Sequence, residues 1–188
     1  MYQVAILGID YSLTSPSLCV YRGEGDFNLS SVNFHYLSDI KKSIKNEGYL
    51  IGTSYPSFTT QEQRYHQISN WVLDVVNLYP ITDVFIEGYA FNAVGRVFQI
   101  AENTGVLKYR LSQYGINSIT VPPTVVKKYA TGKGNANKEK MNDSFIEETG
   151  VNLKSALQLT DKQWNPSSDI IDSYYICKYG ALEYGKEK

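Results

Sequence analysis

Four acidic side chains stand at positions from which their carboxylates could act together. Asp10 follows the apolar run AILGI, and Glu87 follows the run DVFI. Near the end of the chain, the segment SSDIIDSYYICKYG carries Asp169 and Asp172, which the spacing of three places on one face of a helix. A single acid at the end of a strand is usually a turn former or a helix cap, so the pattern of four is the informative feature.

Carboxylates gathered in an apolar setting repel one another and need compensation. A divalent cation would provide it, because magnesium and manganese prefer hard oxygen ligands. Several carboxylates can hold two such ions about 4 Å apart, which suits in-line cleavage of a phosphodiester. The alternative is that Asp169 and Asp172 only complement the dipole of a final helix. We favour a site for two Mg²⁺ ions, with Mn²⁺ able to substitute.

The elements expected around these acids predict an α/β fold. Three meandering strands precede strands that are linked by helices, which indicates a five-stranded mixed sheet flanked by helices. In such a sheet the carboxyl ends of neighbouring strands share a crevice, so Asp10 and Glu87 are expected to meet there. The expected strands are 4–10, 17–23, 30–37, 83–88 and 116–121. The expected helices are about 59–79, 91–114, 124–130, 137–149 and 167–184.

The length of 188 residues suits a single domain, and no linker or internal repeat divides the chain. Residues 38–58 mix Lys, Gly, Ser and Pro, which predicts a peripheral insertion or loop. Cys19 and Cys177 lie in apolar contexts, so we expect buried, reduced thiols rather than a zinc site. The start MYQVAIL lacks the features of a signal peptide, and no apolar run is long enough for a membrane span. A cytoplasmic protein with no membrane partner is expected.

A local excess of positive charge lies between residues 106 and 141. Seven basic residues there face one acid, Glu139, whereas the whole chain has a net charge of −1. Such a cluster suits phosphate groups, and the segment TGKGNANK leads into an expected helix start at Asn137. A solvated, lysine-rich surface is the alternative. The basic residues are Lys108, Arg110, Lys127, Lys128, Lys133, Lys138 and Lys140.

Taken together, these segments resemble the RuvC-type Holliday junction resolvases of the ribonuclease-H-like superfamily. ILGID is similar to the first catalytic strand of that family, VFIEGYAF to the second, and GRVFQIAENTGVLKYRL to the helix that follows. PTVVKKYATGKGNANKEKM resembles a basic segment that the family uses against DNA, and SSDIIDSYYICKYG its closing acidic helix. The resemblance runs from residue 4 to about 182, apart from 38–58. It implies a ribonuclease-H-like fold and one nuclease domain over residues 1–188.

The resemblance also implies roles for individual residues. It implies metal ligation by Asp10, Glu87, Asp169 and Asp172, and a catalytic contribution from Lys138. Lys127 and Lys138 match family lysines placed near the scissile phosphate and the junction backbone. The further DNA contacts that it implies are Lys128, Lys133, Lys140, Tyr89 and Phe91.

The implied activity is that of a magnesium-dependent crossover junction endodeoxyribonuclease acting on four-way or branched DNA. Two symmetrical nicks in one junction need two active sites, which predicts a homodimer, with the helix at 91–114 as the expected interface. Tyr11 and Ser12 stand where the family usually has Pro-Gly, and Ala90 stands at the position of its wedge aromatic. Some phage relatives accept branched DNA broadly, and this divergent chain is expected to behave similarly.

Two alternatives remain open from the sequence. One is a catalytically inactive protein that binds junctions, although all four acids are present. The other is a ribonuclease H acting on RNA–DNA hybrids. The second acid of that enzyme typically lies in a helix, whereas Glu87 follows an expected strand.

Overall fold

A seven-stranded mixed sheet forms the centre of the computed structural model, which describes residues 5–88 and 97–184. The strand order is β4-β5-β3-β2-β1-β6-β7. β1, β2 and β3 form an antiparallel meander, and β6 and β7 run parallel to β1, as the sequence predicted. The strands are β1 (Ala5–Asp10), β2 (Ser17–Tyr21), β3 (Val32–Ser38), β4 (Asn46–Glu47), β5 (Leu50–Ser54), β6 (Ile81–Glu87) and β7 (Ser118–Val121).

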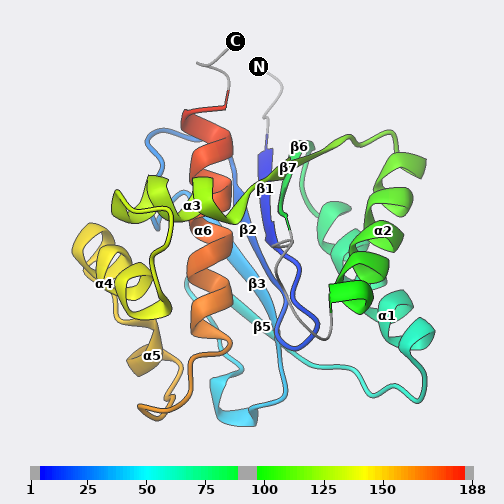
Figure 1. Cartoon of the computed structure of the whole chain (residues 1–188), viewed down its shortest axis with the longest axis horizontal. Coiled ribbons are helices and arrows are strands. Elements are labelled where there is room, and N and C mark those ends of the chain that lie inside the picture. Colours follow the sequence, from blue (N-terminus) through cyan, green and yellow to red (C-terminus); the bar gives the residue numbers. More distant parts are fainter. Residues whose placement is uncertain (1–4, 89–96, 185–188) are drawn as a thin grey trace.

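Helices cover both faces of the sheet (Figure 1). One face is packed against α1 (Gln61–Val76) and α2 (Val97–Gln113). The other is covered by α3 (Pro123–Thr131), α4 (Lys138–Thr149), α5 (Leu153–Ala156) and α6 (Ser167–Leu182). In the described part of the chain, no helix has the length and apolar character that crossing a membrane requires.

The prediction of five strands was wrong, because residues 38–58 contribute two more. β5 pairs parallel with β3, and β4 pairs antiparallel with β5, so the sheet continues past the meander. The connection contains a short 3₁₀ helix, Lys41–Ser43, and the hydroxyl of Tyr36 donates a hydrogen bond of 2.7 Å to the carbonyl of Ser43. Main-chain pairing holds these strands, and in β4 and β5 only Leu50 and Gly52 are buried. Two short edge strands with so little burial leave no clear alternation in the sequence.

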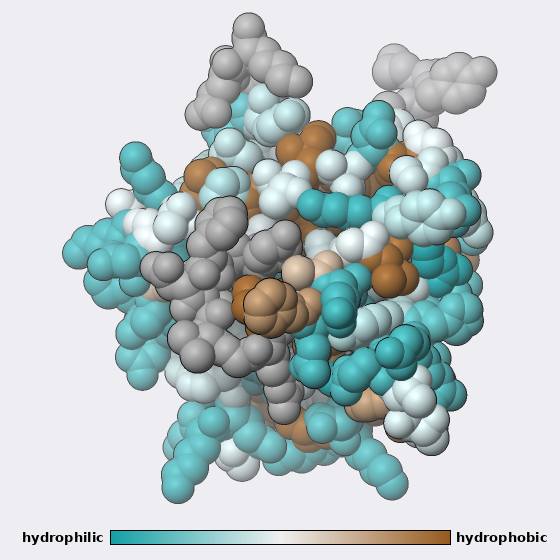
Figure 2. Space-filling model, turned by 45° about the vertical axis from the view of Figure 1, so that its right-hand side comes forward, coloured by the Kyte–Doolittle hydropathy of each residue, from teal (hydrophilic) through white to brown (hydrophobic). Residues whose placement is uncertain are grey.

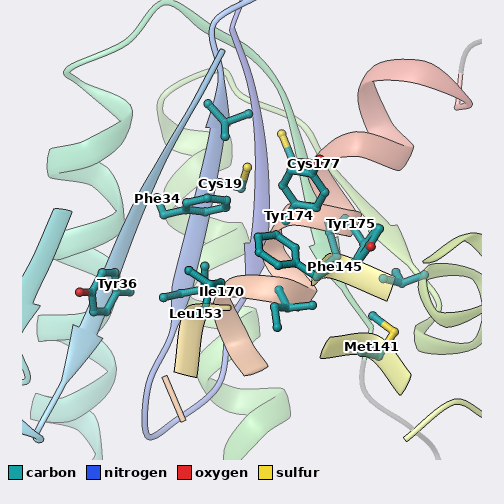
Figure 3. Packing of buried hydrophobic residues seen from close by; sticks show 14 of the residues in the cluster. Cys19, Phe34, Tyr36, Met141, Phe145, Leu153, Ile170, Tyr174, Tyr175 and Cys177 are labelled. Carbon is teal, nitrogen blue, oxygen red and sulfur yellow. The ribbon is translucent and has the colours of Figure 1, made fainter. Parts of the chain in front are cut away.

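Aromatic side chains fill much of the core between the sheet and α6 (Figure 3). The ring of Tyr174 lies 5.1 Å from that of Phe145 and 6.1 Å from that of Phe34, centroid to centroid. Its hydroxyl donates to a carboxylate oxygen of Glu148 at 2.5 Å, so the buried ring keeps a satisfied polar tip. Cys19 and Cys177 are both fully buried in this cluster as free thiols, which confirms the prediction that they are buried.

Two glycines allow α6 to lie directly on the sheet. A Cβ atom at Gly8, in β1, would overlap the backbone of Cys177, and one at Gly180, in α6, would overlap the ring of Phe85. Because neither position carries a side chain, the helix approaches β1 and β6 closely along its length. This close packing places the first turn of α6 beside the carboxyl ends of β1 and β6 (Figure 1).

Candidate active site

The fold brings the four acids of the sequence analysis to one edge of the sheet. β1 ends at Asp10 and β6 ends at Glu87, and the parallel register pairs Ile9 with Ile86, so the two acids follow adjacent paired residues. Asp169 and Asp172 lie in the first two turns of α6. Their negative charges act on both strand-end acids, which places all four in one electrostatic cluster.

Burial makes these acids costly to ionise. Asp10 is 9% exposed and Asp169 is 5% exposed. Burial raises the pKa of Asp10 well above its usual value, and the charges of Asp169, Glu87 and Asp172 raise it further. The pKa of Asp169 is also raised by burial, but hydrogen bonds from nearby hydroxyls and the charge of Lys138 oppose the change.

The other two acids titrate near neutral pH. Burial, followed by repulsion from Asp172, raises the pKa of Glu87 to about 8. Burial, followed by repulsion from Asp169, raises the pKa of Asp172 to about 7. The positive charge of Lys127 lowers the pKa of both, without cancelling the effect of burial. Above these pH values, Glu87 and Asp172 both carry a negative charge beside Asp10 and Asp169.

Asp169 is held by side chains from the loop after β1 and from the start of α6. Ser12 Oγ donates to its Oδ2 at 3.2 Å, Ser15 Oγ donates to the same oxygen, and Asn165 Nδ2 does so at 3.1 Å. Ser168 Oγ donates to the other oxygen, Oδ1, at 3.3 Å. Sequence reasoning assigned no site role to Ser15 or Asn165, since serine and asparagine are common in any loop.

A cavity of about 320 Å³ joins the acids to the basic segment. Glu87 and Asp172 line it together with Lys127 from α3 and Lys138 from α4. The N-terminus of α4 also lies there, capped by Asn137, whose side chain accepts from the backbone N–H of Lys140 at 3.0 Å. A helix N-terminus and two ammonium groups favour an anionic ligand beside the carboxylates.

The remaining basic residues divide into two groups. Lys128, Lys133 and Lys140 are exposed and do not line the cavity. Lys108 and Arg110 lie on α2, where they donate to Thr120 Oγ1 at 2.6 Å and to Ser69 Oγ at 2.7 Å, respectively. These two residues therefore tie α2 to β7 and α1. The predicted DNA contacts Tyr89 and Phe91 lie outside the described residues.

The chemistry of the acids fits a divalent cation, since carboxylate oxygens are the ligands that magnesium and manganese prefer. Within residues 5–88 and 97–184, however, no three acidic, histidine or cysteine side chains form a group that would enclose one ion. Asp169 repels Asp10 and Asp172 most strongly, and Asp172 repels Glu87 most strongly, so the four acids interact as one group.

No protein-family model matches the chain, and no curated protein matches its sequence. Solved structures do match. Thermus thermophilus RuvC aligns with a TM-score of 0.61 and 20% identity over 97% of this chain and 96% of that one. The same organism's RuvC in complex with Holliday junction substrate aligns at 0.65 and 17% identity, over 97% and 95%. Fowlpox virus resolvase, in complex with Holliday junction DNA, aligns at 0.51 and 13% identity, over 95% and 99%.

These alignments show that the chain shares its fold, a mixed sheet with helices on both faces, with solved structures of Holliday junction resolvases. The fold is similar to that of RuvC over nearly the whole chain. The resemblance found in the sequence is thereby confirmed for the fold.

Proposed function

We propose that this protein is a divalent-metal-dependent endonuclease that resolves Holliday junctions or other branched DNA. The observation that carries the proposal is the meeting of Asp10, Glu87, Asp169 and Asp172 beside a cavity lined by Lys127 and Lys138. The similarity in fold to resolvases, two of them in complex with Holliday junctions, supports the choice of substrate. The activity that we propose is that of a crossover junction endodeoxyribonuclease.

The acids and the lysines of the site would have different roles in phosphodiester hydrolysis. The four carboxylates would hold the metal, and Lys127 and Lys138, which line the same cavity as Glu87 and Asp172, would receive the negative phosphate. Two bound Mg²⁺ ions would activate the attacking water and stabilise the leaving oxygen. Lys128, Lys133 and Lys140 lie exposed around α3 and α4, so they would bind the DNA backbone away from the cleavage point.

We further propose a homodimer with α2 at its interface. Phe98 and Tyr109 are eleven residues apart on α2, which places them on one side of the helix, and they are 78% and 65% exposed. Figure 2 views the molecule toward the side of α1 and α2, where hydrophobic residues reach the surface at separate points. Light scattering on the wild type and on Tyr109→Glu tests this interface. A monomeric wild type contradicts it.

Cleavage of a synthetic mobile four-way junction tests the function. With Mg²⁺ or Mn²⁺, the wild type should produce paired, symmetrical nicks, whereas Asp10→Asn and Glu87→Gln should lose at least about a thousandfold in rate. The matched control is Asp83→Asn, which changes an exposed acid at the other end of β6 and should cut normally.

Parallel assays separate the alternatives. Metal-independent junction binding without nicking would indicate an inactive junction-binding protein. Faster cleavage of an RNA–DNA hybrid than of any branched DNA would indicate a ribonuclease H. Forks and flaps in the same panel show how broad the branched substrate range is.

A further inference from the structure

The amide of Asn165 connects a lysine of the cavity to an acid of the site. Its Oδ1 accepts from Lys138 Nζ at 3.1 Å and from Ser168 Oγ at 3.0 Å. Its Nδ2 donates to Asp169 Oδ2 at 3.1 Å and to Ser15 Oγ at 2.7 Å. One uncharged side chain thus contacts the ammonium group, the carboxylate and the loop after β1.

An amide is chemically suited to this position. The Lys138 ammonium can only donate hydrogen bonds, and an ionised Asp169 can only accept them. An amide accepts at one end and donates at the other, so it joins the two groups without adding charge to a site that already holds four acids. Three donors, from Ser12, Ser15 and Asn165, converge on Asp169 Oδ2, whereas Oδ1 faces Ser168 Oγ, which shares its one proton with Asn165 Oδ1.

The backbone around Asn165 is fixed on both sides of the amide. The carbonyl of Trp164 accepts from Ser167 Oγ at 2.6 Å and from the backbone N–H of Ser168 at 2.8 Å. The Lys154 ammonium lies 4.1 Å from the centroid of the Trp164 ring, on the side of α5. These contacts therefore fix the loop that carries the Asn165 amide.

We propose that Asn165 is a positioning residue, which sets the Lys138 ammonium relative to the Asp169 carboxylate and fixes the orientation of that carboxylate. Ser15 links the same contact to the loop after β1. This inference rests on the proposed function, in which Lys138 meets the phosphate and Asp169 meets the metal. Groups that orient metal ligands typically change metal affinity or activity by about 10–100-fold when removed.

The test compares Asn165→Ala and Asn165→Ser with the matched control Asn152→Ala. Asn152 caps α5 and accepts from the backbone N–H of Ser155 at 3.1 Å, so its removal costs a comparable hydrogen bond away from the site. Asn165→Ala should lower the single-turnover cleavage rate by about 10–100-fold, and should weaken Mn²⁺ binding in the absence of DNA by about tenfold. Asn165→Ser should show the same losses, because the serine hydroxyl is too short to contact both Lys138 and Asp169. It replaces Asn165→Ala in the test if the alanine variant folds poorly. Junction affinity in EDTA should change less than about twofold for all three variants, because Lys138 remains present.

A double variant tests the link to Lys138. In a Lys138→Met background, Asn165→Ala should cost less in cleavage rate than it does in the wild type, because part of its effect passes through the missing ammonium. The inference is overturned if wild type cuts junctions while Asn165→Ala and Asn165→Ser behave like Asn152→Ala in rate and in Mn²⁺ affinity. If wild type itself does not cut, the proposed function fails, and Mn²⁺ affinity alone then decides whether Asn165 orients Asp169.

Discussion

Two buried charged regions contact the loop after β1, and they differ in how fully the chain compensates their charge. Arg64, on α1, is 8% exposed. Its Nη2 donates to the carbonyl of Leu13, its Nε donates to the hydroxyl of Tyr55 at 2.8 Å, and its guanidinium lies 4.6 Å from the centroid of the Phe58 ring. The charge is satisfied by carbonyl and hydroxyl oxygens and by aromatic faces within the chain.

The acidic cluster is compensated only in part, by the hydrogen bonds to Asp169 and by the charges of Lys127 and Lys138. Burial raises the pKa values of all four carboxylates, and repulsion raises those of Asp10, Glu87 and Asp172 further; neither Lys127 nor Lys138 restores them to their usual range. A charge that its own protein satisfies stabilises the fold, whereas a charge left unsatisfied favours binding of something else. The difference separates a structural clamp from a candidate active site. The loop lies between them, with Leu13 contacting Arg64 and Ser15 contacting Asp169.

The largest effect that we expect on stability is a gain from Asp172→Asn in the metal-free protein. Below about pH 4 both folded and unfolded wild type hold a proton on Asp172. As the pH rises, the unfolded state loses this proton first, because the folded-state pKa is about 7, and the free energy of unfolding falls. Urea titrations should show the variant more stable than wild type by up to about 4 kcal/mol at pH 8, with little difference at pH 4.

Saturating Mg²⁺ should reduce that difference, because it stabilises the ionised carboxylates of wild type. A gain of equal size at pH 4 and pH 8 would show that the effect is not electrostatic. The acidic cluster would then not differ from the Arg64 region through uncompensated charge.

Arg64→Met should have the opposite effect. Removing the guanidinium leaves the Leu13 carbonyl and the Tyr55 hydroxyl with fewer partners, so we expect a loss of about 2 kcal/mol in the free energy of unfolding. The loss should be the same with and without Mg²⁺, and the folded variant should still nick junctions within about tenfold of wild type. A Mg²⁺-dependent loss would place Arg64 in the functional site.

The smallest effect concerns the exposed part of the basic segment. Lys133→Ala should weaken junction binding by about threefold at low salt, with a shallower dependence on salt concentration. Lys42→Ala, which removes the same charge from the exposed 3₁₀ helix near the other edge of the sheet, is the control. Filter binding over a salt series measures both. Equal effects from the two variants would indicate attraction by net charge alone, without a DNA face.

The sequence allowed the fold class and the four acids to be predicted because their signals are local and strong. A short stretch of sequence is enough to recognise the apolar strands that end in Asp10 and Glu87. Parallel pairing of those strands then brings their ends together. The start of α4 after Asn137 follows equally from its capping side chain. The metal ligation and the catalytic role of Lys138 stay predictions.

Other features depend on contacts between distant parts of the chain. β5 owes its place to pairing with β3, and the sequence of its few residues does not show it. Arg64 lies among polar residues at the start of α1 and would be expected at the surface, yet Tyr55 and Leu13 bury it. The contact between Asn165 and Asp169 depends on the packing of α6, and neither residue type nor spacing reveals it.

Mn²⁺ titration at pH 8, followed by electron paramagnetic resonance, tests most directly whether the acidic cluster is completed by a cation. The account predicts saturable binding by wild type and by Asp83→Asn, binding weakened at least about tenfold in Asp10→Asn, and proton release as Mn²⁺ binds. Absence of saturable binding by wild type, or equal binding by Asp10→Asn, would contradict it.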